Sequence, residues 1–301
     1  MTTAKEIIHY MESLKNEKQR QVLMRFFKTG AGEYGEGDEF LGLKVPQTRE
    51  VVKVVAKDLP LGEVPALLMS RWHEVRLCGL LILVAKFEQL ATKRLAYDEA
   101  AIRGRDEILK MYLQYAEQAN NWDLVDLSAP KILGHWLLLP TAIRIDSASP
   151  QPPPTGGGEA IVFFSSVLPS PSEKGLGVRH LPLQWEGVGG RLHIVDSLAY
   201  SDNLWRQRMS MVCTWKTSQA GDPSWCLRYA EIHLHHPHDL MHKAVGWMLR
   251  EMGKRVSMDL LRDFLCQHAH EMPRTTLRYA IEKMSDQERH HWLTLENRPN
   301  S

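Results

Sequence analysis

The sequence lacks the features of a membrane-spanning or secreted protein. No run of apolar residues approaches the roughly 18 that a transmembrane helix needs. The first eight residues include acidic and basic side chains, where a secretory signal peptide would have an apolar core. The 4 cysteines in 301 residues show neither the spacing of a disulfide framework nor that of a zinc site. We therefore expect reduced thiols and a cytoplasmic location.

A surplus of charge of either sign is also missing. The chain has 37 Lys and Arg against 36 Asp and Glu, a formal net charge of +1. Because DNA-binding proteins usually carry a stronger basic footprint, binding to DNA would require basic residues to be segregated to one face. Residues 241–279 would allow such a face, since they hold seven Lys or Arg against four Asp or Glu.

Apolar residues recur at helical spacing along most of the chain, for example in residues 7–14, 51–55 and 77–84. Breaks that contain Gly or Pro separate these segments at 30–37, 59–62 and 221–223. Single helices of this kind cannot bury an apolar face alone, so we expect stacked antiparallel pairs. The predicted fold is an all-α α-solenoid, and a plain multi-helix bundle fits the periodicity almost as well.

Residues 146–190 do not continue this pattern. They contain seven Pro and eight Gly, a density that prevents long helices, and residues 161–164 are their only candidate strand. We expect an inserted, largely disordered surface loop between an N-terminal half, residues 1–145, and a C-terminal half, residues 191–301, of one helical-repeat domain. A tolerated loop without a role in activity is the preferred interpretation. The alternative is a lid over a binding groove.

The segment 120–126, Asn-Asn-Trp-Asp-Leu-Val-Asp, carries the most specific chemical signal. On a helix, residues four apart stand one above the other, so Trp122 and Asp126 would project from the same face. An aromatic face beside a carboxylate is suited to holding a cation. The segment therefore predicts a site for a cationic substrate.

This segment resembles the signature of the DNA alkylation repair enzymes of the AlkD family, which are HEAT-like-repeat alkylpurine DNA glycosylases. Residues 40–49, 72–76, 204–208, 242–251 and 272–280 are similar to further blocks of that family in the same order. The resemblance covers nearly the whole chain apart from the insert. Several ordered blocks are far more specific than any single motif.

The resemblance implies a HEAT-like solenoid whose concave face follows duplex DNA carrying N3- or N7-alkylated purines. Alkylation at a ring nitrogen makes the base cationic and a good leaving group, and hydrolysis then passes through a cationic sugar. The resemblance also implies a monomer that uses water without a cofactor or metal. Members of this family are thought to act without flipping the base into a tight pocket, unlike most glycosylases.

Site residues follow from the same resemblance. Asp126 is expected to stabilise the sugar cation and to orient the attacking water. Trp122 and Trp247 match the two tryptophans that flank the lesion nucleotide, and Arg208 matches an arginine that would contact a backbone phosphate. The other expected DNA contacts are Tyr34, Lys44 and Lys243.

An alternative of a different class is a non-catalytic HEAT-like-repeat scaffold that binds nucleic acid or protein. The joint presence of Trp122, Asp126, Arg208 and Trp247 favours the enzyme.

Histidines at two places in the chain call for a separate interpretation. Those of residues 233–242 are crowded enough for a metal site, but Pro237 interrupts the segment and the family has an interhelical loop there, so no zinc site is predicted. Hydrogen-bonding groups between repeats are expected at His9, His73 and the Glu74–Arg76 pair.

Overall fold

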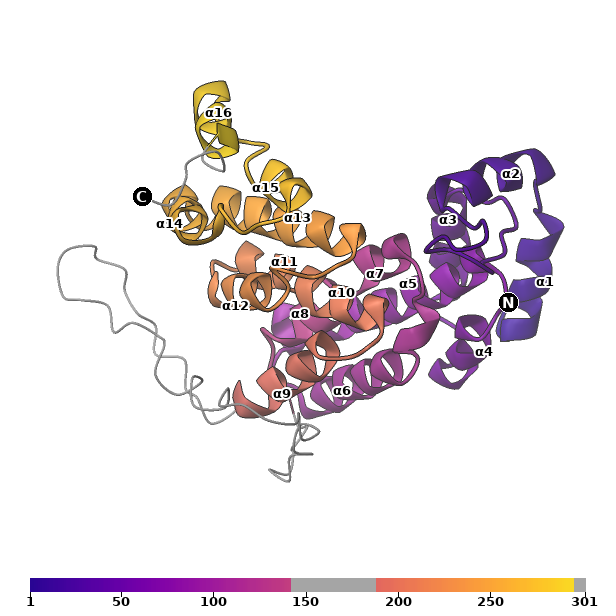
Figure 1. The fold of residues 1–301 in the computed structure, drawn as a ribbon. Coiled ribbons are helices and arrows are strands. Elements are labelled where there is room, and N and C mark those ends of the chain that lie inside the picture. Colours follow the sequence, from indigo (N-terminus) through magenta and orange to yellow (C-terminus); the bar gives the residue numbers. More distant parts are fainter. Residues whose placement is uncertain (142–187, 295–301) are drawn as a thin grey trace, which may run out of the picture.

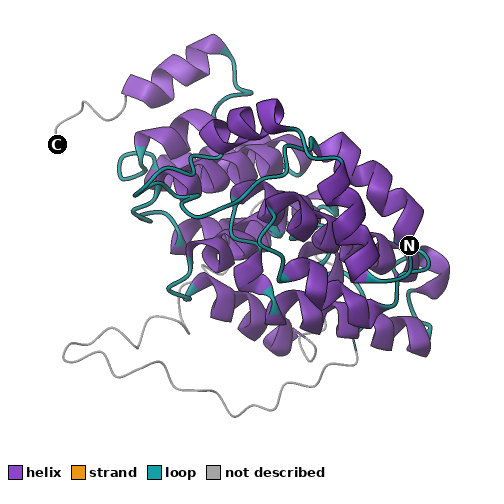
Figure 2. Ribbon diagram, turned by 90° about the vertical axis from the view of Figure 1, so that its right-hand side faces the viewer, coloured by secondary structure: helices purple, strands orange, loops and turns teal. Residues whose placement is uncertain are grey.

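The computed structural model describes residues 1–141 and 188–294, and the regular secondary structure in these ranges is helical (Figures 1 and 2). A single isolated backbone bridge joins Glu39 and Trp72 in the described part of the chain. The predicted all-α class is confirmed. The α-helices are α1 (Ala4–Ser13), α2 (Glu17–Phe26), α3 (Val45–Val55), α4 (Val64–Leu68), α5 (His73–Leu90), α6 (Glu99–Gln114), α7 (Trp122–Ser128), α8 (Leu133–Trp136), α9 (Val188–Ala199), α10 (Leu204–Val212), α11 (Thr214–Gln219), α12 (Ser224–Ile232), α13 (Asp239–Arg255), α14 (Met258–His268), α15 (Arg274–Ala280) and α16 (Asp286–Thr294).

The predicted insert and its candidate strand at 161–164 lie outside the described residues, apart from the end of the insert. Because α9 begins at Val188, residues 188–190 belong to this helix and not to the predicted loop. The glycines at 189 and 190 fall in the first turn of α9, where backbone N–H groups have no acceptor within the helix.

Side-chain caps fix several helix starts. Thr3 and Glu6 form a reciprocal capping box at the start of α1. Asn16, Asp98 and Ser257 each accept a hydrogen bond from a backbone N–H in the first turn of α2, α6 and α14. These boundaries are therefore determined locally, by residues adjacent in the sequence.

Successive helices pack against one another as the chain advances. α3 and α4 lie on α5, α5 contacts α6 and α7, α9 lies on α10, and α13 contacts α10, α14 and α15. Figure 1 shows this progression from α1–α4 at one end of the molecule to α13–α16 at the other. Packing between neighbours in a series is that of a solenoid of HEAT-like antiparallel repeats, so the predicted architecture is confirmed over the plain bundle.

Glu74 at the start of α5 holds the segment before α3 in place. Its Oε2 accepts a hydrogen bond from the backbone N–H of Leu41 at 2.8 Å, and its Oε1 accepts from Gly42 at 2.8 Å and Leu43 at 2.9 Å. Gly42 has a φ of +88°, and a Cβ at this position would lie 2.1 Å from the carbonyl oxygen of Asn16, so only glycine fits. The structural role predicted for Glu74 is thereby confirmed.

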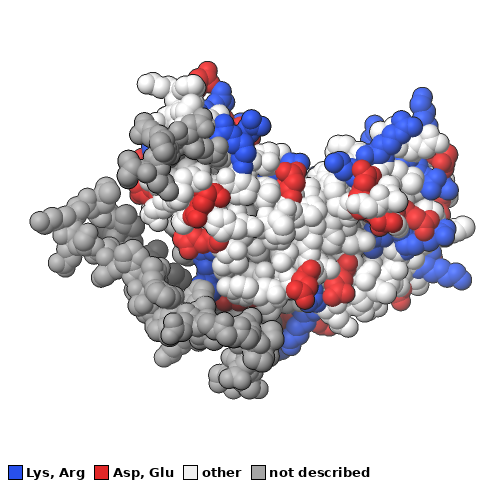
Figure 3. Space-filling model, in the orientation of Figure 1, with Lys and Arg blue, Asp and Glu red and all other residues white. Residues whose placement is uncertain are grey.

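The molecular surface is hollowed between the N-terminal helices α1–α3 and the C-terminal helices α13–α16 (Figure 3). Lys and Arg side chains lie on both sides of this hollow together with Asp and Glu side chains, and much of the surface between the two sides is uncharged.

Candidate functional site

A pocket of about 490 Å³ collects residues from the two ends of the solenoid. Its lining residues come from the end of α2 and the loop after it, and from α7, α10, α13 and α15. Five of its lining side chains are aromatic and one is a carboxylate. The lining residues are Phe26, Tyr34, Trp122, Asp126, Arg208, Leu240, Lys243, Trp247, Arg250 and Tyr279.

α7 presents Trp122 and Asp126 to this pocket one helical turn apart, as their spacing predicts. The Asn121 side chain accepts a hydrogen bond from the backbone N–H of Trp122 at 2.9 Å and so caps the helix. The indole stacks on Phe27, with ring centroids 5.3 Å apart, and meets the edge of Phe26 at 5.8 Å. Trp122 is therefore held by aromatic packing and by the start of its own helix.

Arg208 on α10 clamps the Asp126 carboxylate from the other half of the chain. Its Nε donates to Oδ1 and its Nη2 to Oδ2, each at 2.9 Å, and its Nη1 donates to the carbonyl oxygen of Leu240. The Asp126 side chain is 15% exposed and that of Arg208 only 5%. Burial raises the pKa of the Asp126 carboxyl and the guanidinium of Arg208 acts against that rise. The carboxylate is the more exposed partner and faces the pocket.

α13 contributes one stripe of its surface to the lining of the pocket. Leu240, Lys243, Trp247 and Arg250 are spaced three, four and three residues apart, so they lie on the same side of the helix. α15 approaches this helix at Gly246, where a Cβ would lie 2.4 Å from the carbonyl oxygen of Thr276 and 2.5 Å from the Cβ of Tyr279. The glycine thus permits the close contact that brings Tyr279 to the pocket beside Trp247.

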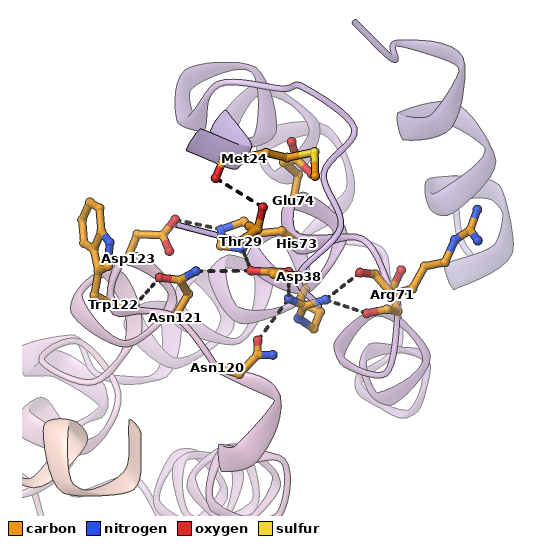
Figure 4. A network of polar contacts seen from close by, with 12 residues as sticks. Met24, Thr29, Asp38, Arg71, His73, Glu74, Asn120, Asn121, Trp122 and Asp123 are labelled. Atoms are coloured by element: carbon orange, nitrogen blue, oxygen red, sulfur yellow. Dashed lines mark hydrogen bonds and ion pairs between the residues drawn. The ribbon is translucent and has the colours of Figure 1, made fainter. Parts of the chain in front are cut away.

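A buried polar network lies behind Trp122 (Figure 4). The His73 ring contacts Asp38 Oδ2 through Nδ1 at 2.7 Å and Asp123 Oδ2, on α7, through Nε2 at 3.0 Å. Arg76 donates to the other oxygen of Asp38 at 2.5 Å. Burial by itself lowers the pKa of His73, but the carboxylates of Asp123 and Asp38 outweigh it and raise the pKa to about 9.

His73 is therefore an imidazolium at neutral pH and joins α5 to α7 by charge. Phe40 stacks on its ring with centroids 4.4 Å apart, and Phe27 lies 5.0 Å from it on the way to Trp122. The structural roles predicted for His73 and Arg76 are confirmed. The same prediction was wrong for His9, which is exposed on α1 because that helix buries its other side.

We expect the free energy of unfolding to fall as the pH rises from about 6.5 to 9. The folded-state pKa of His73, about 9, lies above its ordinary value of 6.5, so its contribution is complete below pH 6.5 and is lost as the pH passes through 9. The loss should be on the order of 2 to 3 kcal/mol. Urea denaturation at pH 6, 7.5 and 9 measures it. His73→Gln is the control, and a pH slope equal in the two proteins would contradict the assignment.

The structure brings together six of the seven predicted site residues. Tyr34, Trp122, Asp126, Arg208, Lys243 and Trp247 all line the pocket. Lys44 is not among the lining residues; it is an exposed residue directly before α3, and its backbone N–H donates to the side-chain oxygen of Gln47. The chemical roles of all seven remain predictions. The lining residues that sequence reasoning missed are Phe26, Leu240, Arg250 and Tyr279.

Histidines between α12 and α13 have separate partners. His233 shares a hydrogen bond with Ser210 Oγ at 2.8 Å, and His236 Nε2 contacts Gln207 Oε1 at 2.8 Å. His238 caps α13 by accepting from the backbone N–H of Leu240. Each of these rings serves local structure.

Comparison with known proteins identifies the family of the chain. The sequence model of the family described as DNA alkylation repair enzyme matches residues 7–145 and 187–284. The chain belongs to the DNA alkylation repair enzyme family, which confirms the resemblance. Its role lies in the repair of alkylation damage, with DNA as its partner.

Among solved structures, a predicted DNA alkylation repair enzyme from Enterococcus faecalis is similar in fold, with a TM-score of 0.55 and 12% sequence identity. The alignment covers 90% of this chain and 97% of that chain. At this identity the likeness shows a shared fold. No curated protein matches the sequence.

Proposed function

We propose that the protein is a DNA glycosylase that hydrolyses the N-glycosidic bond of cationic N3- or N7-alkylated purines in duplex DNA. The observation that carries this proposal is the pocket that the Asp126 carboxylate shares with the indoles of Trp122 and Trp247. A cationic base is attracted to each indole face by roughly 0.5 to 2 kcal/mol. The carboxylate attracts the same charge.

In this proposal the alkylated base leaves with the electron pair of the glycosidic bond and becomes neutral. Positive charge then develops on the sugar at C1′, and the oxygen of a water molecule adds to that carbon. The water loses a proton, and the products are the free base and an abasic site. At about 4 Å a carboxylate stabilises such a cation by roughly 4 kcal/mol at an effective dielectric constant of 20.

The clamp by Arg208 leaves Asp126 able to act. An ionised carboxylate has about four acceptor positions, and Arg208 occupies one on each oxygen. The free positions can orient the water or face the sugar cation. We assign Arg208 to positioning Asp126. Three of its five N–H groups are used, so the predicted phosphate contact is compatible with this role.

The test is release of base from methylated duplex DNA by the purified protein. We expect 3-methyladenine or 7-methylguanine to appear in the supernatant faster than in buffer alone, with abasic sites formed in equal number. Chromatography of the released bases and strand cleavage at abasic sites measure the two products. Binding of the duplex without release above the spontaneous rate would contradict the glycosylase and favour a non-catalytic binding scaffold.

A further inference from the structure

The end of α2 has an unusual backbone at the mouth of the pocket. Among the described residues, Lys28 is the one non-glycine residue with a positive φ, 51°. The Lys28 N–H donates to the carbonyl oxygen of Arg25 at 3.3 Å and the Thr29 N–H to that of Met24 at 3.2 Å. This pair of hydrogen bonds is a Schellman motif with Lys28 at the left-handed position, which glycine usually occupies because a Cβ is unfavourable there.

The Lys28 side chain is directed to the rim of the pocket. Its Nζ lies 5.9 Å from the ring centroid of Tyr34, and Tyr34 lines the pocket. The loop after α2 folds back tightly, because a Cβ at Gly35 would lie 2.3 Å from the carbonyl oxygen of Phe27. This close contact between Gly35 and Phe27 holds Tyr34 beside Lys28.

The ammonium group of Lys28 has no acidic partner. The side chain is exposed, and within residues 1–141 and 188–294 no carboxylate lies within ion-pair distance of it. By contrast, Lys243 and Arg250 at the same pocket are paired with Asp239 and Glu282. An exposed, unpaired cation beside a pocket for a nucleotide is suited to a phosphate oxygen.

We propose that Lys28 binds a DNA backbone phosphate at the mouth of the pocket. The protein thus retains a lysine at a left-handed backbone position that favours glycine, at a cost in stability. This inference rests on the proposed function, since it assigns a DNA contact to the same site. Unlike Lys243 and Arg250, Lys28 need not leave a carboxylate before it binds the phosphate. The lysine should therefore contribute to affinity for any DNA sequence.

Three substitutions separate charge from backbone conformation. Lys28→Gly removes the charge and the energetic cost of the left-handed conformation, Lys28→Gln removes only the charge, and Lys28→Arg keeps the charge and the cost. Gly and Gln should each reduce the slope of log affinity against log salt, measured with undamaged duplex, by about 0.9, which is one phosphate contact. Arg should keep the slope. Gly alone should raise the thermal midpoint, by about 2 to 4 °C.

The matched control is Lys110→Gln, which removes an exposed charge from α6, on the side of the molecule away from the hollow (Figure 1). Its salt slope should equal that of the wild type. An unchanged salt slope in Lys28→Gly, or an equal reduction of the salt slope in Lys110→Gln, would overturn the proposed phosphate contact of Lys28. An unchanged thermal midpoint in Lys28→Gly would overturn the cost in stability. Wild-type protein that shows the Lys28-dependent slope but releases no base would contradict only the glycosylase.

Discussion

Asp126→Asn is expected to lower the rate of base excision by about 100-fold or more, with affinity for undamaged duplex nearly unchanged. Asparagine has nearly the shape of aspartate but no negative charge. It therefore loses the attraction to the sugar cation, which develops only in the transition state. A 100-fold loss corresponds to about 2.7 kcal/mol of transition-state stabilisation. Single-turnover excision of a methylated duplex measures the chemical step.

Two comparisons make this result specific to Asp126. Asp259→Asn on α14 removes an exposed carboxylate, 84% accessible, and should excise at the wild-type rate. The wild-type rate should also fall on acidification at a higher pH than an ordinary aspartate would give, because burial raises the pKa of Asp126. Excision by Asp126→Asn at the wild-type rate would remove this residue from the mechanism.

His73→Gln is expected to lower the free energy of unfolding by about 3 to 5 kcal/mol, the range for breaking a buried ion pair by removal of one partner. His73 is 2% exposed, and the substitution leaves the Asp123 carboxylate without its cation. Urea denaturation at pH 7 provides the measurement. His9→Gln on the exposed side of α1 should change the stability by no more than about 0.5 kcal/mol. Equal stability of the two variants would show that the network around His73 contributes little to the free energy of unfolding.

Helical spacing made part of the site predictable. Trp122 and Asp126 are four residues apart, and the periodicity of α7 alone determines that they share a face. The same rule could have found Arg250, which completes the stripe of Lys243 and Trp247 on α13. Arg250 lies within the family-like block 242–251, but the resemblance implied a site role only for Lys243 and Trp247 in that block.

Tertiary packing determined the rest. Asp126 and Arg208 are separated by 82 residues, and no local pattern indicates that they form a bidentate pair. Phe26 is 61% exposed at the end of α2, where the sequence shows only an apolar residue on a short helix. Its place beside Trp122 depends on how the N-terminal repeats stack. The return of the loop that carries Tyr34 likewise depends on close contacts at Gly35.

The two halves of the solenoid are joined by side chains on both sides of residues 142–187. Arg191 on α9 donates to the carbonyl oxygens of Leu137 and Leu139, and Arg208 holds Asp126. Direct contacts between the two halves thus support their relative placement. The gene could accordingly be divided between residues 141 and 188, and the two polypeptides would still possess the complementary surfaces from which the pocket assembles.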